Sequence, residues 1–496
     1  SSHLPQKPAE NHLMRVLFVA SEVFPLVKTG GLADVVAALP PALSQLGVDV
    51  RVLIPGYPKV LDGLDLSGRA VRLGGLVGGH PARILYGRVS NLQLLVLDCP
   101  ALYERPGNPY TGPDGRDWHD SHLRFGALCD AAAWLAGPEG GVRWRPDVIH
   151  GHDWQAGLAA AYVKRSPEPR PGTVLTVHNL AYQGVFSKDT LPSLHLPWSM
   201  FGVEGLEYGG HLGFLKAGLY YSDKLTTVSP TYARQIQTPT YGHGLHGLLQ
   251  TRDADLHGIL NGIDTDLWNP ATDPHLVATY DHRDPFAGKA RNKQAVQRAF
   301  GLEQDPGAPL FCVVSRLVTM KGLDLLISAG STLLRRGAQL AVLGSGEQRI
   351  EQGFDAAAAH WPGRISVRHG YDEPLAHLLQ AGADAIVVPS RTEPCGLTQM
   401  YGLRYGTIPV VRRTGGLADS VVDANAHNLA HQHATGVVFN DMDADALAWA
   451  LGRTIDLYHH QPLWRAMVIR AMQQDFSWRG SAARYAAIYR SVARPE

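Results

Sequence analysis

One acidic residue lies between a predicted strand and a predicted helix in the C-terminal half of the sequence. Residues 385–388 (Ala-Ile-Val-Val) predict a buried parallel strand, Pro389 ends it, and helical spacing begins after Gly396. Glu393 thus precedes a helix N-terminus, where free N–H groups and the helix dipole favour an anion. Because an anion would repel a carboxylate, we expect Glu393 to face neutral, hydroxyl-rich groups of a ligand. A capping carboxylate on a surface loop is the alternative.

Two cations follow another predicted strand of the same half. Residues 310–314 form an apolar run that ends in a loop containing Arg316 and Lys321, five residues apart. An arginine can bind two phosphate oxygens at once, whereas a lysine acts as a point charge. The two side chains together therefore suit a diphosphate group.

A glycine pair lies between the first predicted strand, residues 14–20, and the first predicted helix. Gly30 and Gly31 let the backbone approach a ligand closely, and the start of the helix can hold a phosphate. Lys28 is placed to reach a phosphate or a sugar, and a tight turn with a solvated lysine is the alternative. The stretch is not GxGxxG, so the dinucleotide-binding fingerprint is absent.

Polar residues also follow two later strands of the N-terminal half. Asp153 comes after a strand predicted at residues 146–150, and His178 follows the strand at residues 174–177. In open α/β sheets ligands bind outside the carboxyl ends of the strands, and these ends converge on one edge. A single histidine is more often structural, but polar residues after three strands of one half are harder to assign to chance. We therefore expect a ligand at this edge.

The composition is that of a soluble globular protein with two or three domains. Of 496 residues, 45% are hydrophobic and 18% are charged. Lys plus Arg equals Asp plus Glu, 45 each, so the net charge does not support a nucleic-acid or membrane-surface partner. Four scattered cysteines without a CxxC pair argue against a zinc site and favour a reducing, cytoplasmic location. No apolar run reaches the roughly 20 residues of a membrane span.

The succession of predicted strands and helices divides the chain into two α/β halves. The segments that we expect are a disordered extension at 1–13, a Rossmann-like domain at 14–255, a second one at 256–478 and a final helix at 479–496. Between and after the strands at 50–55 and 94–98 we expect a loop-rich region that ends at residues 106–110. Residues 225–230 are predicted to be the last strand of the first half, and the polar residues 250–257 to be a hinge.

The sequence repeats itself once at a strand-to-helix turn. Residues 28–36 read KTGGLADVV and residues 413–421 read RTGGLADSV, one in each half. The echo predicts two similar α/β units with comparable glycine-rich edges that could face each other across a cleft. Strand–Gly–Gly–helix turns also recur for steric reasons alone, and coincidence is the alternative.

Five ordered motifs resemble those of the bacterial glycogen synthase and plant starch synthase family. They are KTGGLAD at 28–34, HNLAYQG at 178–184, NGID at 261–264, SRL and KGLD within 315–324, and EPCGLTQ at 393–399. The resemblance extends over nearly the whole chain. It implies the GT-B fold, with two Rossmann-like doubly wound domains facing across a deep cleft and a C-terminal helix crossing back to the N-terminal domain. It also implies retaining transfer of glucose from ADP-glucose to the non-reducing 4-OH end of an α-1,4-glucan, without a metal or other cofactor.

The resemblance implies roles for individual residues. Arg316 and Lys321 would hold the diphosphate and stabilise negative charge on the leaving ADP. Glu393 would bind sugar hydroxyls, His178 would contact the sugar near the reacting carbon, and Asp153 would line the same pocket. The further implied substrate-binding residues are Glu22, Lys28, Gly30, Gly31, Asp34, Tyr110, Asn179, Asn261, Tyr371 (beside the base), Cys395, Gly396, Leu397 and Thr398.

The residues alone leave the route to retention open. Many retaining GT-B enzymes have a second glutamate eight residues after the first, where this chain has Tyr401; the resembled family lacks it too, and ribose binding stays unassigned. Retention needs either a carboxylate nucleophile or a same-face path in which the leaving phosphate takes the acceptor's proton. Because no nucleophile is obvious, we expect the same-face path through an oxocarbenium-like state.

Other functions are weighed against this one. A retaining GT-B glucosyltransferase that uses UDP-glucose or another acceptor would share most of these features. An inactive glucan-binding protein should have lost the cations or the acid, and all are present. A phosphorylase is disfavoured because no stretch resembles a pyridoxal-phosphate lysine motif, and an oxidoreductase because GxGxxG is missing. The expected partners are ADP-glucose and an α-1,4-glucan, with no nucleic acid and no membrane; the sequence does not indicate the oligomeric state.

Overall fold

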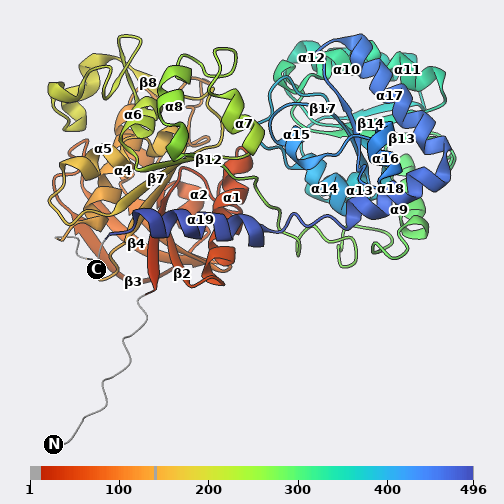
Figure 1. Ribbon diagram of the computed structural model, residues 1–496. Helices are drawn as coiled ribbons and strands as arrows, with labels where there is room; N and C mark the ends of the chain where they lie inside the picture. The colour runs from red at the N-terminus through yellow and green to blue at the C-terminus, as the bar shows by residue number, and fades with distance from the viewer. Residues whose placement is uncertain (1–12, 139–141, 495–496) are drawn as a thin grey trace, which may run out of the picture. The chain divides into compact units, whose positions relative to one another are not determined.

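The computed structural model describes residues 13–138 and 142–494 (Figure 1). The N-terminal extension predicted at residues 1–13 lies, apart from Leu13, outside the described residues. No helix in the described part of the chain is both long and apolar enough to cross a lipid bilayer.

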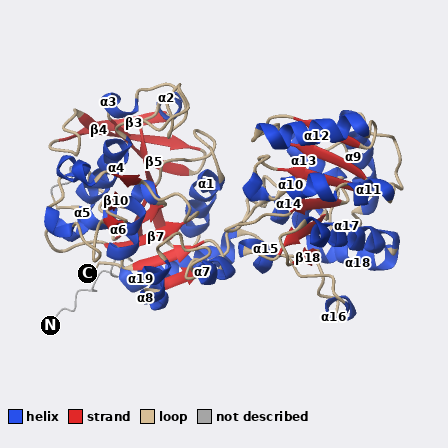
Figure 2. Cartoon of the chain, turned by 90° about the horizontal axis from the view of Figure 1, so that it is seen from above, coloured by secondary structure: helices blue, strands red, loops and turns tan. Residues whose placement is uncertain are grey.

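The described residues form two compact units. Unit 1 comprises the residues up to Thr227, Ile236–Ile259 and the residues from Trp478 onward. Unit 2 comprises Val228–Gln235 and Leu260–Ser477. In both units parallel strands lie between layers of helices (Figure 2), which is the expected α/β architecture.

Unit 1 is built on a nine-stranded sheet. Its strands are β1 (Met14–Val19), β2 (Val48–Pro55), β3 (Asp65–Leu73), β4 (Ala82–Val89), β5 (Leu92–Asp98), β6 (Val148–His152), β7 (Gly172–Val177), β11 (Lys224–Thr227) and β12 (Leu256–Gly258). The order across the sheet is β12-β11-β7-β6-β1-β2-β5-β4-β3. The strands from β12 to β5 are parallel, and β4 and β3 extend the sheet as an antiparallel edge. A small second sheet contains β8 (Val185–Phe186), β10 (His211–Gly213) and β9 (Glu207–Tyr208).

The parallel part of this sheet is doubly wound. Counted along the chain, the parallel strands from β5 to β12 lie in the order third, second, first, fourth, fifth, sixth, seventh. The direction of winding therefore reverses between β1 and β6, which pair with Val16 opposite Val148. In such sheets ligands bind outside the carboxyl ends of the strands at the reversal point.

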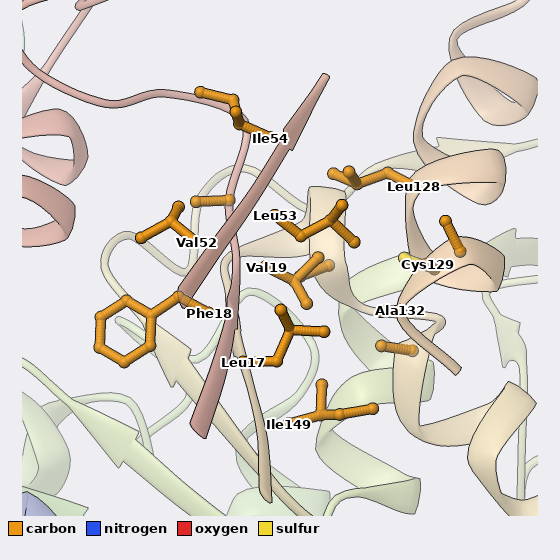
Figure 3. Packing of buried hydrophobic residues seen from close by; sticks show 14 of the residues in the cluster. Leu17, Phe18, Val19, Val52, Leu53, Ile54, Leu128, Cys129, Ala132 and Ile149 are labelled. Atoms are coloured by element: carbon orange, nitrogen blue, oxygen red, sulfur yellow. The ribbon is translucent and has the colours of Figure 1, made fainter. Parts of the chain in front are cut away.

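The central strands of unit 1 are buried on both faces. On β1, Leu17 and Val19 point toward α4 (Ser121–Ala136), where Leu128 and Ala132 receive them, while Phe18 points to the opposite face (Figure 3). All three β1 side chains are fully buried. Burial on both faces is why the sequence of this strand is a continuous apolar run rather than an alternating one.

The helices of unit 1 cover both faces of the sheet. They are α1 (Gly31–Ser44), α2 (Pro58–Asp62), α3 (Pro100–Tyr103), α4, η1 (Trp154–Ala156), α5 (Ala159–Arg165), η2 (Lys188–Leu194), η3 (Trp198–Met200), α6 (Phe214–Tyr221), α8 (His246–Thr251), η4 (Asp253–Asp255) and α19 (Trp478–Val492).

The last helix of the chain, α19, belongs to unit 1 and packs beside α1 (Figure 1). Tyr485, Ile488 and Tyr489 form the apolar face of α19 and are buried. At Gly172, the first residue of β7, an added Cβ would lie 2.0 Å from the Val492 carbonyl oxygen. A glycine is therefore what allows the end of α19 to approach this strand.

Unit 2 is built on a six-stranded, all-parallel sheet. Its strands are β13 (Leu310–Val314), β14 (Gln339–Leu343), β15 (Ile365–Arg368), β16 (Ala385–Val388), β17 (Ile408–Arg412) and β18 (Val437–Phe439). The order β15-β14-β13-β16-β17-β18 repeats the doubly wound pattern of unit 1. Here the winding reverses between β13 and β16, so the loops that follow these two strands are neighbours.

The helices of unit 2 follow its strands in the usual alternation. They are α7 (Pro230–Gln235), α9 (Phe286–Ala299), η5 (Thr319–Lys321), α10 (Leu323–Ala329), α11 (Ser331–Arg335), α12 (Gln348–His360), α13 (Glu373–Gly382), α14 (Thr398–Tyr405), α15 (Gly415–Ser420), α16 (Ala426–Ala430), α17 (Ala444–His459) and α18 (Gln461–Met472).

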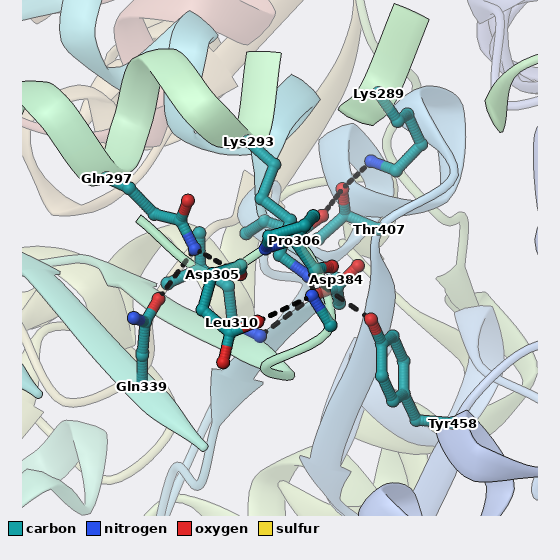
Figure 4. Close-up of polar contacts among 12 residues, drawn as sticks. Lys289, Lys293, Gln297, Asp305, Pro306, Leu310, Gln339, Asp384, Thr407 and Tyr458 are labelled. Carbon is teal, nitrogen blue, oxygen red and sulfur yellow. Dashed lines mark hydrogen bonds and ion pairs between the residues drawn. The ribbon is translucent and has the colours of Figure 1, made fainter. Parts of the chain in front are cut away.

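A buried polar network ties α9 to the amino ends of the strands in unit 2 (Figure 4). Asp384, directly before β16, accepts a hydrogen bond from the Leu310 N–H at 2.8 Å and pairs with Lys293 Nζ at 2.7 Å. Lys289 Nζ donates to Thr407 Oγ1 at 2.8 Å, and burial lowers the pKa of Lys289 to about 7. The network fixes the end of the sheet opposite to the loops that follow β13 and β16.

A stack of three rings lies beside α13 in unit 2. The Trp268 ring is sandwiched between His377 and Tyr401, with centroid distances of 3.7 and 3.9 Å. His377 Nδ1 lies 2.6 Å from Asp273 Oδ2, and its Nε2 lies 3.1 Å from Glu373 Oε1. Burial alone would lower the pKa of His377, but the hydrogen bonds to the two carboxylates outweigh it and raise this pKa to about 8.

We expect the His377 contacts to make stability depend on pH above neutrality. Because the folded pKa is about 8 and the ordinary one 6.5, the stabilisation is complete below 6.5 and is lost as the pH rises through about 8. The loss amounts to roughly 2 kcal/mol. Urea unfolding of the wild type and His377→Gln at several pH values isolates this contribution as their difference, because other groups titrate equally in both. A difference that stays constant from about pH 6 to about pH 9 would contradict the assignment.

Most predicted strands and helices are confirmed, and two predictions are wrong. The region between β2 and β5 is not a loop but contains β3 and β4. The strand at 224–227 is not the last of the first half, because β12 pairs beyond it. The residues predicted to be a hinge, 250–257, include the end of α8, η4 and the start of β12, and the chain passes into unit 2 after Ile259. The missed strands are short or interrupted by glycine, and two of them, β3 and β12, lie at the edges of the sheet, so none has a continuous apolar run.

Candidate active site

The Glu22 carboxylate fixes the loop that follows β1. Glu22 is 3% exposed and accepts hydrogen bonds from Thr29 Oγ1 at 2.8 Å and from the Gly30 N–H at 3.3 Å. It also accepts from the Thr29 N–H and from the Tyr110 hydroxyl. Ser21 Oγ lies 2.7 Å from the Tyr110 oxygen. Glu22 and Tyr110, both predicted to bind substrate, thus bind each other and shape the loop.

Lys28 and the glycine pair lie at the exposed end of the same loop. Lys28 Nζ forms an ion pair with Asp34 Oδ2, on the first turn of α1, at 2.7 Å. Because the Gly30 N–H donates to Glu22, an anion at this turn would meet the outward N–H groups of the helix start, from Gly31 onward.

Asp153 holds the loop that follows β7. Its Oδ1 accepts hydrogen bonds from the N–H groups of His178 at 2.7 Å and Asn179 at 3.4 Å. Its backbone has φ +60°, a conformation that costs energy outside glycine and persists where the surroundings enforce it. Burial raises the pKa of Asp153 to about 7, although the two N–H donors act in the opposite direction. The predicted pocket residues Asp153, His178 and Asn179 are therefore linked through main-chain hydrogen bonds.

His178 is partly exposed and electrically neutral near pH 7. Burial of its ring lowers the pKa of His178 to about 3. Its Nε2 lies 2.9 Å from His152 Nδ1, whereas its Nδ1 makes no hydrogen bond with any described residue. One ring nitrogen is thus held by the protein and the other is left for a ligand.

In unit 2 the two predicted cations differ in their surroundings. Arg316, after β13, is exposed and forms neither an ion pair nor a hydrogen bond through its side chain with the described residues. Lys321 Nζ lies 2.7 Å from Glu393 Oε2, with side-chain exposures of 24% and 9%. Ser390 Oγ donates to the same carboxylate oxygen at 3.0 Å. Lys321 and Glu393 therefore neutralise each other, and Arg316 is the cation that a phosphate would meet uncompensated.

Several polar contacts brace the loop that contains Glu393. Gln399 Nε2 donates to the carbonyl oxygens of Cys395 at 3.0 Å and Gly396 at 2.9 Å. Ser229 Oγ donates to the Pro394 carbonyl oxygen at 2.6 Å. The loop is thus held from its own helix and from the segment before α7.

The β13 and β16 loops are also tied to each other. Arg391 pairs with both oxygens of Asp324, at 2.7 and 2.8 Å, and its N–H donates to the Met320 carbonyl oxygen at 2.9 Å. At Gly322 an added Cβ would lie 1.9 Å from the Pro389 carbonyl oxygen. The two loops are therefore braced against each other, which holds Lys321 within reach of Glu393.

Of the remaining predicted residues of the Glu393 loop, Cys395 is buried and Gly396, Leu397 and Thr398 are half-buried. Burial raises the pKa of the Cys395 thiol to about 12, which leaves it a poor nucleophile. Gly396 has φ +75°, which favours glycine, and α14 begins at Thr398 directly after Leu397. Asn261, 7% exposed, lies beside Cys395, and its Oδ1 is buried without a partner among the described residues.

Tyr371 follows β15 at the carboxyl edge of the same sheet. Its side chain is 67% exposed, and its hydroxyl donates to Glu373. Glu373 also contacts the three-ring stack, with its Oε1 3.1 Å from His377 Nε2. An exposed ring in a fixed orientation can serve as a platform for a flat base.

The two echoed glycine pairs occupy matching turns but have different surroundings. At Gly30 an added Cβ would meet nothing within 4 Å. At Gly415, with φ +45°, it would lie 1.8 Å from the Glu393 carbonyl oxygen, and at Gly416 it would lie 2.1 Å from the Cys395 carbonyl oxygen. In unit 2 the pair therefore exists to let α15 pack under the Glu393 loop.

This contrast predicts unequal effects of two identical substitutions. We expect Gly415→Ala to lower the free energy of unfolding by about 1–3 kcal/mol or more, because Ala is strained at this φ and its Cβ overlaps backbone. We expect Gly30→Ala, in open space, to change it by less than about 0.5 kcal/mol. Thermal or urea unfolding of both variants checks this. Equal stability losses would show that the packing of the two turns is alike.

Several residues that build the site were not predicted from sequence. They are Ser390, Gln399, Ser229, the Asp324–Arg391 pair and His152. Gln399 and Asp324 fall inside motifs, and His152 is next to Asp153, so position could have suggested them. Nothing in the sequence around Ser229 indicates its role, because its hydrogen-bond partner Pro394 is far away in the sequence.

Together these loops bring an exposed cation, the N-terminus of α14 and a carboxylate to one sheet edge of unit 2. Arg316 and the first turn of α14 can bind a diphosphate, while the Glu393 loop offers an acid and main-chain groups for sugar hydroxyls. In unit 1 the edge near β1, β6 and β7 offers a neutral histidine and polar side chains. Such an arrangement suits a nucleotide sugar rather than a nicotinamide cofactor.

Comparisons with known proteins agree with this chemistry. Residues 15–251 match the family described as starch synthase catalytic domain, and residues 297–468 match glycosyl transferases group 1. A glycogen synthase from Rhodopseudomonas palustris (strain BisB18) is 53% identical over 477 residues, covering 96% of this chain and 97% of the relative. A glycogen synthase from Roseobacter denitrificans is 52% identical over 476 residues, covering 96% and 99%.

Solved structures show the same relationship. The catalytic domain of starch synthase IV from Arabidopsis thaliana, bound to ADP and acarbose, superposes with a TM-score of 0.86 at 33% identity, covering 97% of this chain and 99% of that one. A sucrose-phosphate synthase from Thermosynechococcus elongatus shares the fold alone, with a TM-score of 0.59 at 16% identity over 96% and 98% of the chains.

The two doubly wound units, together with the match to a starch synthase structure, define a GT-B glycosyltransferase, as the resemblance implied. The protein is an enzyme of this class. Within it, the chain belongs to the glycogen synthase and starch synthase family, whose bacterial glycogen synthases it matches over nearly its whole length.

Proposed function

We propose that the enzyme elongates an α-1,4-glucan by transferring glucose from ADP-glucose to the non-reducing 4-OH end, with retention and release of ADP. The observation that carries this is the joined pair of loops after β13 and β16, in which Arg316 is exposed on the same loop as Lys321 and Lys321 pairs with Glu393. Relatives named glycogen synthase, and the Arabidopsis domain bound to ADP and acarbose, support ADP as the nucleotide and a glucan as acceptor.

Arg316 and Lys321 hold the diphosphate and stabilise charge on the leaving ADP in this proposal. Charge develops on the leaving phosphate as the glycosidic bond breaks, and preorganised cations lower that barrier more than any other group available here. Main-chain donors at Leu397 and Thr398, with the Thr398 hydroxyl, add to them. Glu393 binds sugar hydroxyls while its charge is compensated by Lys321.

Unit 1 supplies the residues for the transferred sugar and the acceptor. His178 contacts the sugar near the reacting carbon, and Asp153 holds the loop that presents it. The other residues assigned to substrate are Glu22, Lys28, Gly30, Gly31, Asp34, Tyr110 and Asn179 in unit 1, and Asn261, Tyr371, Cys395 and Gly396 in unit 2.

We propose same-face transfer, in which the leaving phosphate takes the proton of the acceptor hydroxyl. Both candidate carboxylates already have partners: Asp153 accepts two main-chain N–H groups, and Glu393 binds Lys321 and Ser390. Neither is a free nucleophile. Mass spectrometry of enzyme quenched during turnover with a slow fluorinated donor should therefore find no glucosylated peptide. Detection of a glucosyl-Asp or glucosyl-Glu peptide would contradict same-face transfer and show that the reaction is a double displacement.

The donor is tested by measuring nucleotide release with ADP-glucose and with UDP-glucose, using glycogen or a maltooligosaccharide as acceptor. We expect release from ADP-glucose that depends on the acceptor, with equal rates in the presence and absence of EDTA because the cations act in place of a metal. Release from UDP-glucose alone would mean that the protein is a glycosyltransferase of the same class whose donor is UDP-glucose. Glucan binding without transfer from either donor would indicate a binding protein.

A further inference from the structure

A row of three histidines extends inward from the sugar-side residue His178 in unit 1. His150 and His152 lie on β6, and His178 follows the neighbouring strand β7. The ring centroids of His150 and His152 are 4.2 Å apart, and those of His152 and His178 are 5.2 Å apart. His150 and His152 are fully buried. Only His178, at the end of the row, is partly exposed.

The innermost histidine of the row has both ring nitrogens satisfied. His150 Nδ1 lies 2.6 Å from the Tyr489 hydroxyl of α19, and its Nε2 lies 2.6 Å from Thr176 Oγ1. Hydroxyl groups can donate or accept, so they adapt to whichever nitrogen of His150 carries the hydrogen. His150 therefore places no constraint on its neighbours through hydrogen bonds.

His152 is different because only one of its nitrogens has a partner. Its Nδ1 lies 2.9 Å from His178 Nε2. Its Nε2 is buried and has no hydrogen-bond partner among the described residues. The rings packed against it are those of Phe18, with centroids 4.8 Å apart, and His150. A hydrogen on Nε2 of His152 would therefore have no acceptor among the described residues.

The contact between His152 and His178 holds a single hydrogen. Burial lowers the pKa of both rings well below their ordinary value, so both are neutral near pH 7. Either His152 donates from Nδ1 to His178 Nε2, or His178 donates from Nε2 to His152 Nδ1. In the second arrangement His152 would bear an N–H at its buried Nε2 with nothing to receive it. Buried orphan N–H groups are rarer and costlier than buried bare acceptors, so the first arrangement is preferred.

We propose that His152 is a positioning residue that fixes His178 as the tautomer with its hydrogen on Nδ1, so that His178 acts on the sugar only as a hydrogen-bond donor. With Nε2 occupied as an acceptor, the hydrogen of His178 must be on Nδ1, the nitrogen that no described residue binds. Such a group can stabilise a hydroxyl oxygen or developing negative charge, and it cannot take the acceptor's proton. The inference rests on the proposed function, in which His178 meets the sugar.

The tautomer can be observed without any substrate. Nitrogen-15 NMR of the full chain labelled at histidine distinguishes a protonated from a bare ring nitrogen, and spectra of His178→Asn and His152→Asn assign the signals. We expect His178 protonated at Nδ1 and bare at Nε2, and His152 protonated at Nδ1. His178 protonated at Nε2 would overturn the proposal. Because no donor sugar is needed, this result is independent of whether ADP-glucose is the substrate.

Substituting His152 by aspartate gives a kinetic test, because activity should change in opposite directions with pH if His178 is a hydrogen-bond donor and if it is a base. The carboxylate that His152→Asp introduces would only accept, so His178 would keep a hydrogen on Nε2 and lose the one on Nδ1 as the pH rises. We expect His152→Asp to lose activity, by about tenfold or more, as the pH rises through the new His178 pKa. If His178 were a base at Nδ1, the same variant would gain activity over that range. The other titratable groups nearby, His150 and Asp153, are present in every variant compared.

Two matched variants separate tautomer control from structural damage. His152→Asn is close in shape to His152→Asp but cannot ionise, and its amide can donate to His178 Nε2, so its pH profile should follow the wild type. Tyr489→Phe removes a hydrogen bond from the same buried row without touching His152, and should lower stability while leaving kcat within about twofold. Identical pH profiles for the Asp and Asn variants would contradict the proposal. If the Asp variant fails to fold, the NMR spectrum of the wild type alone decides which ring nitrogen of His178 carries the hydrogen.

Discussion

Replacing Arg316 by alanine should lower kcat by roughly 10²–10³-fold while leaving the stability of the protein unchanged. Arg316 is exposed and makes no side-chain contact with the described residues that its loss would break, so we expect a change in unfolding free energy below about 0.5 kcal/mol. Its guanidinium is the uncompensated cation beside the proposed phosphate position, because Lys321 is neutralised by Glu393. Steady-state kinetics with ADP-glucose and glycogen, with a thermal melt of each variant, measure both effects.

Two controls sharpen the Arg316 result. Arg316→Lys keeps the charge but not the two-oxygen contact, so its rate should lie between those of the wild type and the alanine variant. Arg298→Ala removes an exposed charge from α9, away from the loops, and should leave the rate unchanged. Wild-type kcat in Arg316→Ala would mean that Lys321 alone suffices for the leaving group.

Replacing Glu393 by alanine should abolish most activity and also weaken the fold. The substitution removes the shared partner of Lys321 Nζ and Ser390 Oγ at a nearly buried position. We expect a stability loss of about 1–3 kcal/mol, discounted from a fully buried pair because Lys321 is partly exposed. Loss of the sugar contact and displacement of Lys321 should lower kcat by roughly 10²–10³-fold. Steady-state kinetics and urea unfolding of the same preparation measure the loss of kcat and the loss of unfolding free energy.

Glu393→Gln distinguishes the two causes of that loss. Glutamine keeps the shape and one acceptor oxygen, so it should restore most of the stability. If the charge of Glu393 also acts on the sugar or tunes Lys321, activity will remain low in Glu393→Gln despite the restored fold. Full activity in this variant would instead reduce Glu393 to a structural brace for its loop.

The doubly wound architecture was predictable because its central strands are buried on both faces. Runs such as Leu17–Val19 on β1 and residues 385–388 on β16 are apolar throughout, and polar residues begin where each strand ends. The edge strands β3 and β12 were missed because edge strands pack on one side and tolerate polar residues and glycine.

The site was predictable as a set of residue types but not as a set of partners. Sequence spacing places Lys321 and Glu393 after neighbouring strands, yet only the fold shows that they pair, which leaves Arg316 as the uncompensated one of the two predicted cations. Likewise, the two glycine pairs have nearly the same sequence, but only the fold shows that Gly415 packs under Glu393 whereas Gly30 faces open space. The hydrogen shared by His152 and His178 depends on which nitrogen is buried, a property that no pattern of residues encodes.

The most direct measurement of the central claim is the structure of the product made from ADP-glucose carrying ¹³C at C1 of the glucose. Incubation with a short maltooligosaccharide, followed by NMR of the isolated chains, reports both the linkage and the anomeric configuration of the added unit. We predict a single new α-1,4-linked glucose at the non-reducing end and one equivalent of ADP. A β linkage, attachment at another hydroxyl, or labelled free glucose with an unchanged acceptor would contradict the account.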